Sequence, residues 1–230
     1  MSATPSAAVE SARALRLVEF NLHVARFAHR SWYEHAVSDP GLAGALCDEQ
    51  GRLRPRVEPQ VSQWLLQELE LQGEMDWKLD SPQMRLWLLD RPALERLALE
   101  LALAMHREWV VRIIDATRVR ALAAKVGEEA LRFVVQELPG GCLHYQSPVV
   151  SLEGDLSLID KELQEHGART LVALLDPAWR AVRARAQLFF DRALMRGDGP
   201  PLQPALCRRA LDLIRGQLLP RRFEEWAWCF

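Results

Sequence analysis

The 230 residues include 29 lysines and arginines against 31 acidic residues, giving a net charge of −2, and 49% of them are hydrophobic. This composition is typical of a globular chain and excludes an intrinsically disordered one, which would hold far fewer apolar residues. The near-neutral charge provides no bulk attraction to nucleic acid or to anionic lipid, and the length fits one domain or two small ones.

The cysteines and the apolar runs indicate where the chain works. Cys47, Cys142, Cys207 and Cys229 lie far apart and form no CxxC pair, which predicts reduced thiols and no metal knuckle. Residues 1–8 lack the basic start and apolar core of a signal peptide. Apolar stretches fall short of the roughly 18 residues that a membrane span needs. We therefore expect a soluble, cytoplasmic protein without direct membrane insertion.

Apolar residues recur with the spacing of a helix. Leu94, Leu97, Ala98, Leu101 and Met105 form one apolar stripe along a helix of about 3.6 residues per turn. Three further stripes are Val119, Leu122, Ala123 and Val126; Leu131, Val134, Val135 and Leu138; and Val182, Ala186, Phe189 and Ala193. The pattern predicts an all-α fold, a compact bundle of about eight to ten helices.

Glycine, proline and capping residues set the expected boundaries in the first half. A first helix is expected from about 7 to 37, followed by a stretch at 38–58 that is mostly loop because it is rich in Pro and Gly. A second helix is expected over 60–72, ending at Gly73.

Five further helix boundaries are predicted along the chain. Ser81 before Pro82 predicts an N-cap, and Asp90 with Pro92 predicts another helix start. Asp115 and Thr117 interrupt the next helical run. Another helix starts at Gly127-Glu128-Glu129, whose acidic residues suit the positive end of the helix dipole, and the run 138–141 closes the first half.

The second half is expected to resume near Asp155, with Gly167 separating one helix from the next. A long helix is expected from Asp176-Pro177 to about Arg196, and a last one over 204–218, stopped by a proline.

The stretch from 139 to 151 could be a hinge or a boundary between small domains. Within it, His144 to Leu152 looks extended and is interpreted as a loop. We favour a single helical domain over residues 1–230, with this possible subdivision.

Histidines on the first expected helix do not predict a metal site. His23, His29 and His35 are six residues apart, which turns each about 240° from the last, so they share no face. Glu19 and His23 have the i, i+4 spacing of a metal pair, but polar helices produce such pairs by chance. We expect solvated or capping histidines and no metal or other cofactor.

No pattern of residues specifies an enzyme. Cys142 and His144 are close enough for a nucleophile and its base, but no orienting carboxylate is evident, so a structural role is favoured. The phosphate-loop, dinucleotide and nucleophile-elbow patterns are absent.

One segment supports a rival hypothesis. Ala123, Gly127 and Phe133 have the small-residue spacing of a DNA-binding helix-turn-helix, which would span 117–138. Its second helix would begin with Glu128 and Glu129, whose carboxylates would face phosphates. We keep a helix-turn-helix transcriptional regulator as the alternative and expect no nucleic-acid partner.

The chain has eight tryptophans, and their positions suggest two roles. Those expected in helices and in the core are Trp32, Trp64, Trp87, Trp109 and Trp179. Trp226, Trp228 and Phe230 follow the last expected helix, where aromatic residues either fold back onto the bundle or anchor a partner. These three are the candidate partner-binding residues, with both readings open.

The order of several segments resembles a known family. The segments are Phe27-Ala28-His29-Arg30-Ser31-Trp32, Leu86-Trp87-Leu88-Leu89-Asp90, Ala93-Leu94-Glu95-Arg96-Leu97-Ala98, Ile113-Ile114-Asp115, Val119-Arg120-Ala121-Leu122 and Gly127-Glu128-Glu129-Ala130-Leu131-Arg132-Phe133. In this order they resemble the SctK family of type III secretion proteins, which includes YscK, PscK and similar plant-pathogen Hrp proteins. The resemblance is best over 85–135 and looser over 20–35.

The resemblance implies a non-enzymatic adaptor in the cytoplasmic sorting platform beneath the injectisome. Members of this family link the cytoplasmic domain of the inner-membrane ring protein SctD to SctQ, which forms pods around the export ATPase. The implied partners are therefore a SctQ-like pod protein and a SctD-like ring protein. The implied location is cytoplasmic and peripheral to the inner membrane through those partners, with no cofactor.

Overall fold

The computed structural model describes residues 7–34, 45–48, 53–113, 115–140, 159–195 and 203–229. These residues form helices and one isolated antiparallel bridge between Cys47 and Leu53, so the predicted all-α fold is confirmed. The predicted loop at 144–152, with Cys142 beside it, and most of the predicted loop at 38–58 lie outside the described residues.

Contacts between Cα atoms divide the chain into two compact units. Unit 1 comprises Met1–Leu94, Leu175–Asp198 and Glu225–Phe230, and unit 2 comprises Glu95–Leu174 and Gly199–Glu224. Both units are therefore assembled from stretches far apart in the sequence. Of the predicted boundary at 139–151 only the first two residues are described, so the single-domain hypothesis stays a prediction.

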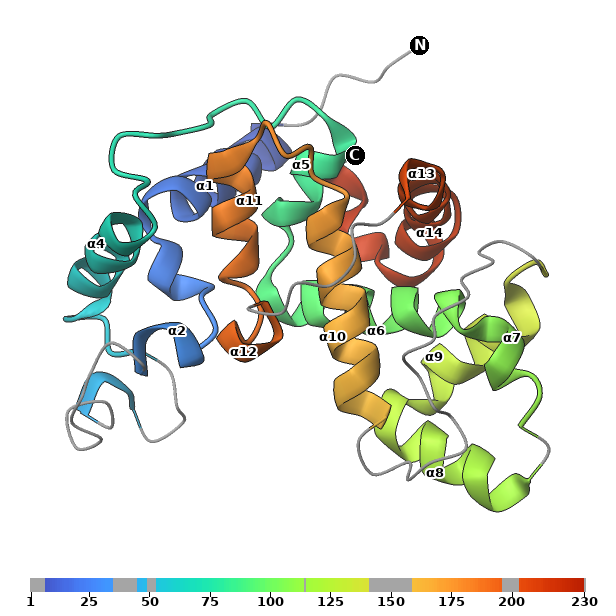
Figure 1. Cartoon of the computed structure of the whole chain (residues 1–230). Coiled ribbons are helices and arrows are strands. Elements are labelled where there is room, and N and C mark those ends of the chain that lie inside the picture. The colour runs from blue at the N-terminus through green and yellow to red at the C-terminus, as the bar shows by residue number, and fades with distance from the viewer. Residues whose placement is uncertain are drawn as a thin grey trace, which may run out of the picture. The chain divides into compact units, whose positions relative to one another are not determined.

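Unit 1 is built from one helix of 16 residues and several of 11 residues or fewer. They are α1 (Ala7–Leu22), η1 (Val24–Arg26), α2 (Ser31–Glu34), α4 (Glu58–Glu68), α5 (Pro82–Arg85), η2 (Leu86–Leu88), α11 (Arg180–Gln187), α12 (Arg192–Met195) and most of η6 (Glu224–Cys229). Helix α4 packs on η1 and on α2, and α12 packs on α2 (Figure 1).

Aromatic rings form the centre of unit 1. The rings of Phe27 and Phe189 stack with centroids 4.2 Å apart, and Phe20 stacks on Phe27 at 5.9 Å. Trp87 lies against Phe189 at 5.8 Å and edge-on to Phe190 at 6.2 Å. All five side chains are buried. Such pairs add about 0.5–1.5 kcal/mol each beyond the area they bury.

The first helix ends earlier than predicted, at Leu22 instead of about 37. Asn21 is buried, and its side-chain amide donates to the carbonyl of Asp76 (2.8 Å) and accepts from the same residue's N–H (2.9 Å). The N–H of Ala25 donates to Ser62 Oγ (3.0 Å) instead of to a helical carbonyl. The prediction of one continuous helix was wrong because the Asn21 side chain and the Ala25 N–H form hydrogen bonds with residues distant in sequence. Residue His35 lies outside the described residues.

The second helix spans Glu58–Glu68 instead of 60–72. It ends at a left-handed residue, Glu70 (φ 54°), where the N–H of Leu71 donates to the carbonyl of Leu66 (2.8 Å). This is the Schellman arrangement, in which a buried apolar residue, here Leu71, follows the turn. Gly73 has φ 77° but lies in the turn beyond the helix.

The predicted N-cap at Ser81 and the predicted helix start at Asp90 are confirmed, and Asp115, which was predicted to interrupt a helical run, also caps a helix. The capping bonds run from the N–H of Met84 to Ser81 Oγ (3.2 Å), from that of Ala93 to Asp90 Oδ1 (2.9 Å), and from that of Thr117 to Asp115 Oδ1 (2.7 Å). Each satisfies an N–H that the first helical turn leaves without a partner. Local sequence is enough to place these helix starts.

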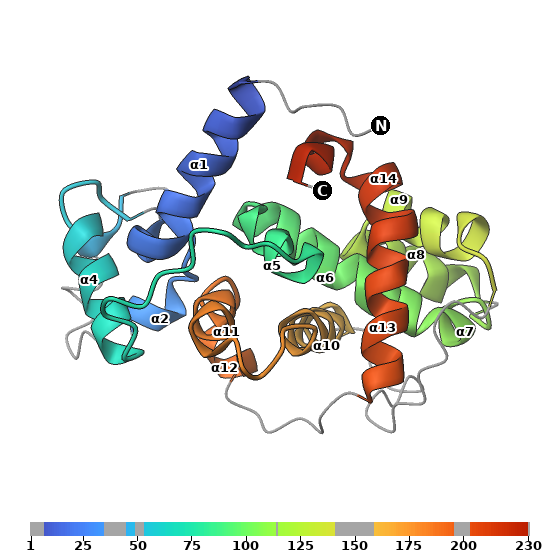
Figure 2. The same ribbon diagram turned by 90° about the horizontal axis from the view of Figure 1, so that it is seen from above.

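Unit 2 contains most of one 15-residue helix, the whole of another, and several shorter ones. They are most of α6 (Arg91–Met105), then α7 (Arg107–Val110), α8 (Ala116–Val126), α9 (Glu128–Arg132), the π-helical η3 (Phe133–Glu137), α10 (Ile159–Ala173), α13 (Pro204–Leu213), the π-helical η5 (Ile214–Leu218) and α14 (Leu219–Arg222). Helix α8 packs on α9 and on α10, and α7 packs on η3. Figure 2 shows α13 continuing into α14.

Most of the predicted stripes form the core. All five residues of the stripe on α6 are buried. Buried members of the other stripes are Leu122, Val126, Leu131, Val134, Leu138, Val182, Ala186 and Phe189. Val119 and Ala193 are exposed instead. The exposure of Val119 matters below.

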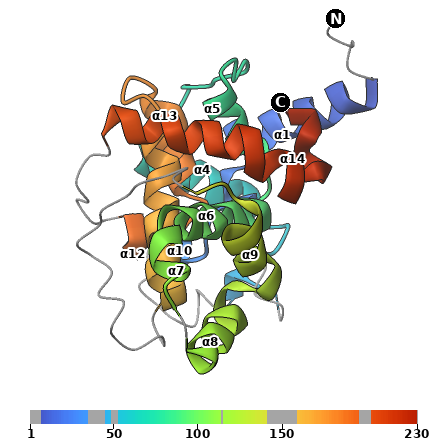
Figure 3. The same cartoon turned by 90° about the vertical axis from the view of Figure 1, so that its right-hand side faces the viewer.

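Gly167 does not separate two helices, as predicted, but lies buried inside α10. A Cβ atom at this position would stand 1.8 Å from the carbonyl oxygen of Ala98 on α6. The glycine is therefore present because the two helices approach closely there, and Figure 3 shows α6 and α10 side by side. Sequence alone treats glycine as a helix breaker, whereas here it permits packing.

The long helix predicted from Asp176 to Arg196 is divided into α11 and α12. Between them, the carbonyl of Leu188 accepts from the N–H of His29 (2.7 Å), and that of Phe190 accepts from Trp32 Nε1 (2.8 Å). Those two carbonyls thus bond to the N-terminal stretch of unit 1, and a single-helix prediction could not foresee this.

The last helix continues past its predicted end at 218 and reaches Arg222. In η5 the helix widens, and the N–H of Leu219 donates to the carbonyl of Ile214. Pro220 then stands in the first turn of α14, where a residue without an N–H is tolerated. The proline therefore begins a helical turn where it was predicted to stop one.

Candidate protein-interaction surfaces

Of the three candidate partner-binding residues, only the side chain of Trp226 is described. It belongs to unit 1 and is 8% exposed. The guanidinium carbon of Arg16 on α1 lies 5.3 Å from the centroid of its ring, the geometry of a cation–π contact. Trp226 is thus folded back onto its unit. The backbone of Trp228 is part of η6, while Phe230 lies outside the described residues. The partner-binding role of all three stays a prediction.

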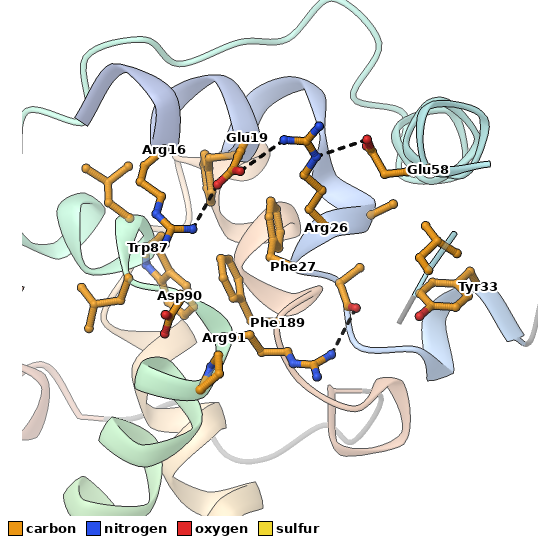
Figure 4. A pocket seen from close by; sticks show the side chains of 17 residues that line it. Arg16, Glu19, Arg26, Phe27, Tyr33, Glu58, Trp87, Asp90, Arg91 and Phe189 are labelled. Atoms are coloured by element: carbon orange, nitrogen blue, oxygen red, sulfur yellow. Dashed lines mark hydrogen bonds and ion pairs between the residues drawn. The ribbon is translucent and has the colours of Figure 1, made fainter. Parts of the chain in front are cut away.

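Arg16 also borders a cavity of about 390 Å³ in unit 1. Aromatic side chains and charged side chains share its lining, as Figure 4 shows. The aromatic members are Phe20, Phe27, Tyr33, Trp87 and Phe189, and the charged members are Arg16, Glu19, Arg26, Glu58, Asp90 and Arg91. Three cations thus balance three carboxylates.

Four of the six charged groups of this cavity are paired with one another. Glu19 accepts from Arg16 Nη1 (3.0 Å) and Arg26 Nη1 (3.3 Å), and Arg26 Nε donates to Glu58 Oε2 (3.2 Å), as the dashed lines in Figure 4 mark. Because the arginines are partly exposed, each pair contributes at most about 1 kcal/mol. These ion pairs hold the side chains of Arg16, Glu19, Arg26 and Glu58 in place around the cavity.

Glu58 is the most buried charge of the group. Burial alone would raise the pKa of its carboxyl, but hydrogen bonds from Ser62 (2.9 Å), from His23 and from Arg26 outweigh burial and lower that pKa. His23 lies just beyond α1, and its Nδ1 is 3.1 Å from Glu58 Oε1, so its carboxylate partner is on α4 and is not Glu19 of α1. The histidine therefore takes part in the hydrogen-bond network around Glu58.

The other histidines and acids form no metal centre among the described residues. No group of three His, Cys, Asp or Glu side chains with metal-binding geometry occurs there. His29 Nδ1 lies 2.8 Å from Ser31 Oγ, and burial lowers the pKa of His29.

Tyr33, which lines the cavity of unit 1, has a raised pKa. Burial is the first cause and the Cys47 thiol the second, so the hydroxyl of Tyr33 stays neutral.

A second surface lies in unit 2. It is a groove of about 580 Å³ between the end of α7, helix α8, helix α9 and η3. Nine of the residues that line it are apolar: Val110, Val111, Ile113, Val119, Leu122, Ala123, Ala124, Leu131 and Val135. Two of the larger ones are open to solvent, Val111 (42% exposed) and Val119 (36% exposed).

This groove occupies the segment for which DNA binding was the alternative. Helices α8 and α9 are joined by Gly127 alone (φ 91°), whereas a DNA-binding helix-turn-helix uses a turn of about three to four residues. Glu128 and Glu129 are exposed at the start of α9 and would repel phosphates. The geometry gives the DNA-binding alternative no support.

Two buried polar pairs in unit 2 were not anticipated from the sequence. Arg222 Nε and Nη2 reach the carboxylate of Glu100 at 3.1–3.3 Å, and this carboxylate is buried inside the apolar helix α6. Burial raises the pKa of Glu100, and the bonds from Arg222 partly oppose the rise. The signal available beforehand was a glutamate within an otherwise apolar stretch of a core helix.

The second pair consists of two histidines. His106 Nε2 lies 2.9 Å from His166 Nδ1, and both rings are largely buried. The pKa of each histidine is lowered to about 4, first by burial and then by the charge of a neighbour, which is His166 for His106 and Arg169 for His166. Sixty residues separate the two positions, so nothing local could pair them.

The fold and these surfaces describe an all-helical protein with an ion-paired cavity and an open apolar groove. A protein-family model described as YOP proteins translocation protein K (YscK) matches residues 18–148, more than half of the chain. The chain therefore belongs to the YscK family of type III secretion proteins, as the resemblance in its sequence implied. The matched range includes the whole groove.

The other comparisons found no relatives. Neither a search of curated proteins nor a search of solved structures found a match. In the part of the chain that the structure describes, every helix is too short or too polar to cross a membrane.

Proposed function

We propose that this chain is a non-enzymatic adaptor of the cytoplasmic sorting platform in a type III secretion system. In this role it links a SctD-like inner-membrane ring protein to a SctQ-like pod protein. It acts in the cytoplasm and reaches the inner membrane through its protein partners. The observation that carries the proposal is the match of the YscK family model to residues 18–148.

The surfaces of the chain support a binding role. An adaptor needs separate surfaces for its two partners, and units 1 and 2 each offer a distinct recess. The unit 1 recess is lined by ion-paired and aromatic side chains, whereas the unit 2 recess is lined by apolar side chains and has a charged edge. Trp226, Trp228 and Phe230 remain proposed partner-binding residues, with Trp228 the one to change first because Trp226 is buried.

A reconstitution with purified proteins tests the linking role. The full chain is mixed with the SctQ-like protein and the SctD-like cytoplasmic domain of the same secretion system, singly and together. We expect two binary complexes and one ternary complex by size-exclusion chromatography with light scattering. Binding to only one partner, or competition between the two, would contradict the linking role.

An affinity purification from the native bacterium provides the cellular test. We expect the tagged chain to recover both partners from cells that are assembling the apparatus, as identified by mass spectrometry. A tagged chain carrying Trp228→Ala tests the tail, and Trp77→Ala is the matched control because Trp77 is an exposed tryptophan of the same unit. Recovery of neither partner by the unchanged chain would refute the proposal.

A further inference from the structure

The groove of unit 2 is an exposed apolar surface that the core does not use. Val119 belongs to an apolar stripe of α8, yet it is exposed while Leu122 and Val126 of the same stripe are buried. Val111, at the end of α7, adds a second exposed aliphatic side chain to the same groove. A contiguous apolar recess with a charged edge is typical of a surface that another molecule covers.

The edge of the groove is positively charged. Arg120 of α8 and Arg132 of α9 line it and are exposed, against a single acidic lining residue, Glu128. Over residues 107–136 there are six basic and four acidic side chains, so this segment is positive in a chain whose net charge is −2. The positive edge therefore favours a partner that carries carboxylates beside the apolar residues that cover the groove.

The shape of the walls indicates what kind of segment fits. The walls are two helices joined by one residue and the end of a third, so they expose side chains and no open sheet edge among the described residues. An amphipathic helix is the element that places an apolar ridge in such a groove, with anchors at i, i+3 or i+4, and i+7. An extended strand would find no backbone partners there.

We propose that this groove binds an amphipathic helix of a partner protein, with acidic residues flanking its apolar ridge. The aliphatic side chains of the groove receive the ridge, and Arg120 and Arg132 pair with the flanking carboxylates. The inference rests on the proposed adaptor function and deepens it, because it names the chemistry by which one of the two partners is recognised.

Substitutions at exposed positions test the groove without disturbing the core. Val111→Asp and Val119→Asp place a carboxylate where the apolar ridge would lie, and the matched control is Leu15→Asp, an exposed leucine of unit 1 (67% exposed). Binding to the SctQ-like protein and to the SctD-like cytoplasmic domain is measured by titration calorimetry. We expect each groove variant to lower the affinity for one of the two partners by about tenfold or more. The control should bind both partners as the unchanged chain does.

Charge reversal tests the acidic flank. The double variant Arg120→Glu with Arg132→Glu should lower the affinity for the same partner. The salt dependence of that affinity should also fall. The matched control reverses two exposed arginines of unit 1, Arg30→Glu with Arg56→Glu, and should leave the affinity unchanged. Circular dichroism checks each fold, and Val119→Ser replaces any aspartate variant that fails to fold.

Cross-linking identifies the occupant. A photo-reactive amino acid at position 119 should join the chain to a partner peptide with helical apolar spacing and a net negative charge. A cross-link to a second copy of this chain, to duplex DNA, or to a basic or extended peptide would overturn the inference. If the unchanged chain binds neither partner, the adaptor function fails; if it binds both and the groove variants bind equally well, the groove inference alone fails.

Discussion

At Gly167 a single missing Cβ atom lets α10 approach the backbone of α6. We expect Gly167→Ala to destabilise the protein by about 3 kcal/mol or more, because the added carbon would overlap the carbonyl of Ala98, which is backbone and must shift. The free energy of unfolding from urea titration, followed by circular dichroism, measures the effect.

Gly216 is the matched control for this change. It also lies in a helical segment, η5, but no atom stands within 4 Å of an added Cβ. Gly216→Ala should leave stability unchanged or increase it by up to about 1 kcal/mol, because alanine favours helix. Equal effects at the two glycines would show that close packing does not explain Gly167.

Arg222 compensates a buried charge. We expect Arg222→Ala to destabilise the protein by about 3–5 kcal/mol, because Glu100 would remain buried without its partner. Chemical denaturation measures the loss. Glu129, whose side chain is 74% exposed and lies 3.5 Å from Arg222, is the control: Glu129→Ala should change stability by less than about 1 kcal/mol.

A double substitution separates the buried charge from packing. Replacing Glu100 by Leu in the Arg222→Ala variant removes the uncompensated carboxylate, so much of the lost stability should return. If the double variant is as unstable as Arg222→Ala, then the contacts of the arginine with its neighbours, such as Phe133, account for the loss.

Between elements, the paired histidines His106 and His166 predict a dependence of stability on pH. Their pKa values near 4 in the folded protein lie below the ordinary value of 6.5, so the unfolded chain binds more protons between these pH values. Stability should therefore fall as pH decreases from 6.5 to 4, by up to about 3 kcal/mol per histidine.

Thermal unfolding at a series of pH values measures this dependence. Replacing both histidines, His106→Gln with His166→Gln, should flatten the curve between pH 6.5 and 4, while His23→Gln should keep most of the slope because it leaves the buried pair intact. An equally steep curve in the double variant would assign the acid sensitivity to other groups.

The helix starts were predictable because their signals are local. Ser81, Asp90 and Asp115 cap the N–H groups two or three residues ahead, within reach of any sequence window. The helix interruptions at His23 and between α11 and α12 were not predictable, because residues dozens to more than a hundred positions away take the hydrogen bonds. Gly167 and Pro220 were misread because their usual helix-breaking effect depends on surroundings that only the fold supplies.

The two candidate interaction surfaces were likewise predictable only as far as local sequence determines them. The aromatic tail was visible in the sequence, but the burial of Trp226 against Arg16 depends on residues 210 positions apart. The groove segment attracted attention for its small-residue spacing, yet its exposed Val119 counted as core because periodicity does not show whether a neighbouring helix covers a stripe.

At the scale of the whole molecule, the tail completes unit 1. We expect Trp226→Ala to destabilise this unit by about 3–5 kcal/mol, because it removes a large buried side chain. Unfolding followed by circular dichroism measures the change. Trp77→Ala, at an exposed position of the same unit, should stay within about 0.5 kcal/mol. Unchanged stability of the Trp226 variant would mean that this ring is available to a partner.

The composition of unit 1 has a consequence for synthesis. Its parts, up to Leu94, from Leu175 to Asp198, and from Glu225 onward, leave the ribosome in that order, separated by the residues of unit 2. The aromatic centre of the first stretch therefore stays incomplete until Phe189 and Phe190 have emerged, and the place of Trp226 beside Arg16 stays empty until the last part has emerged. We expect the nascent chain to depend on chaperones during this interval, and translation products that stop before Glu225 to be degraded. Only chains translated past that point would then reach the apparatus.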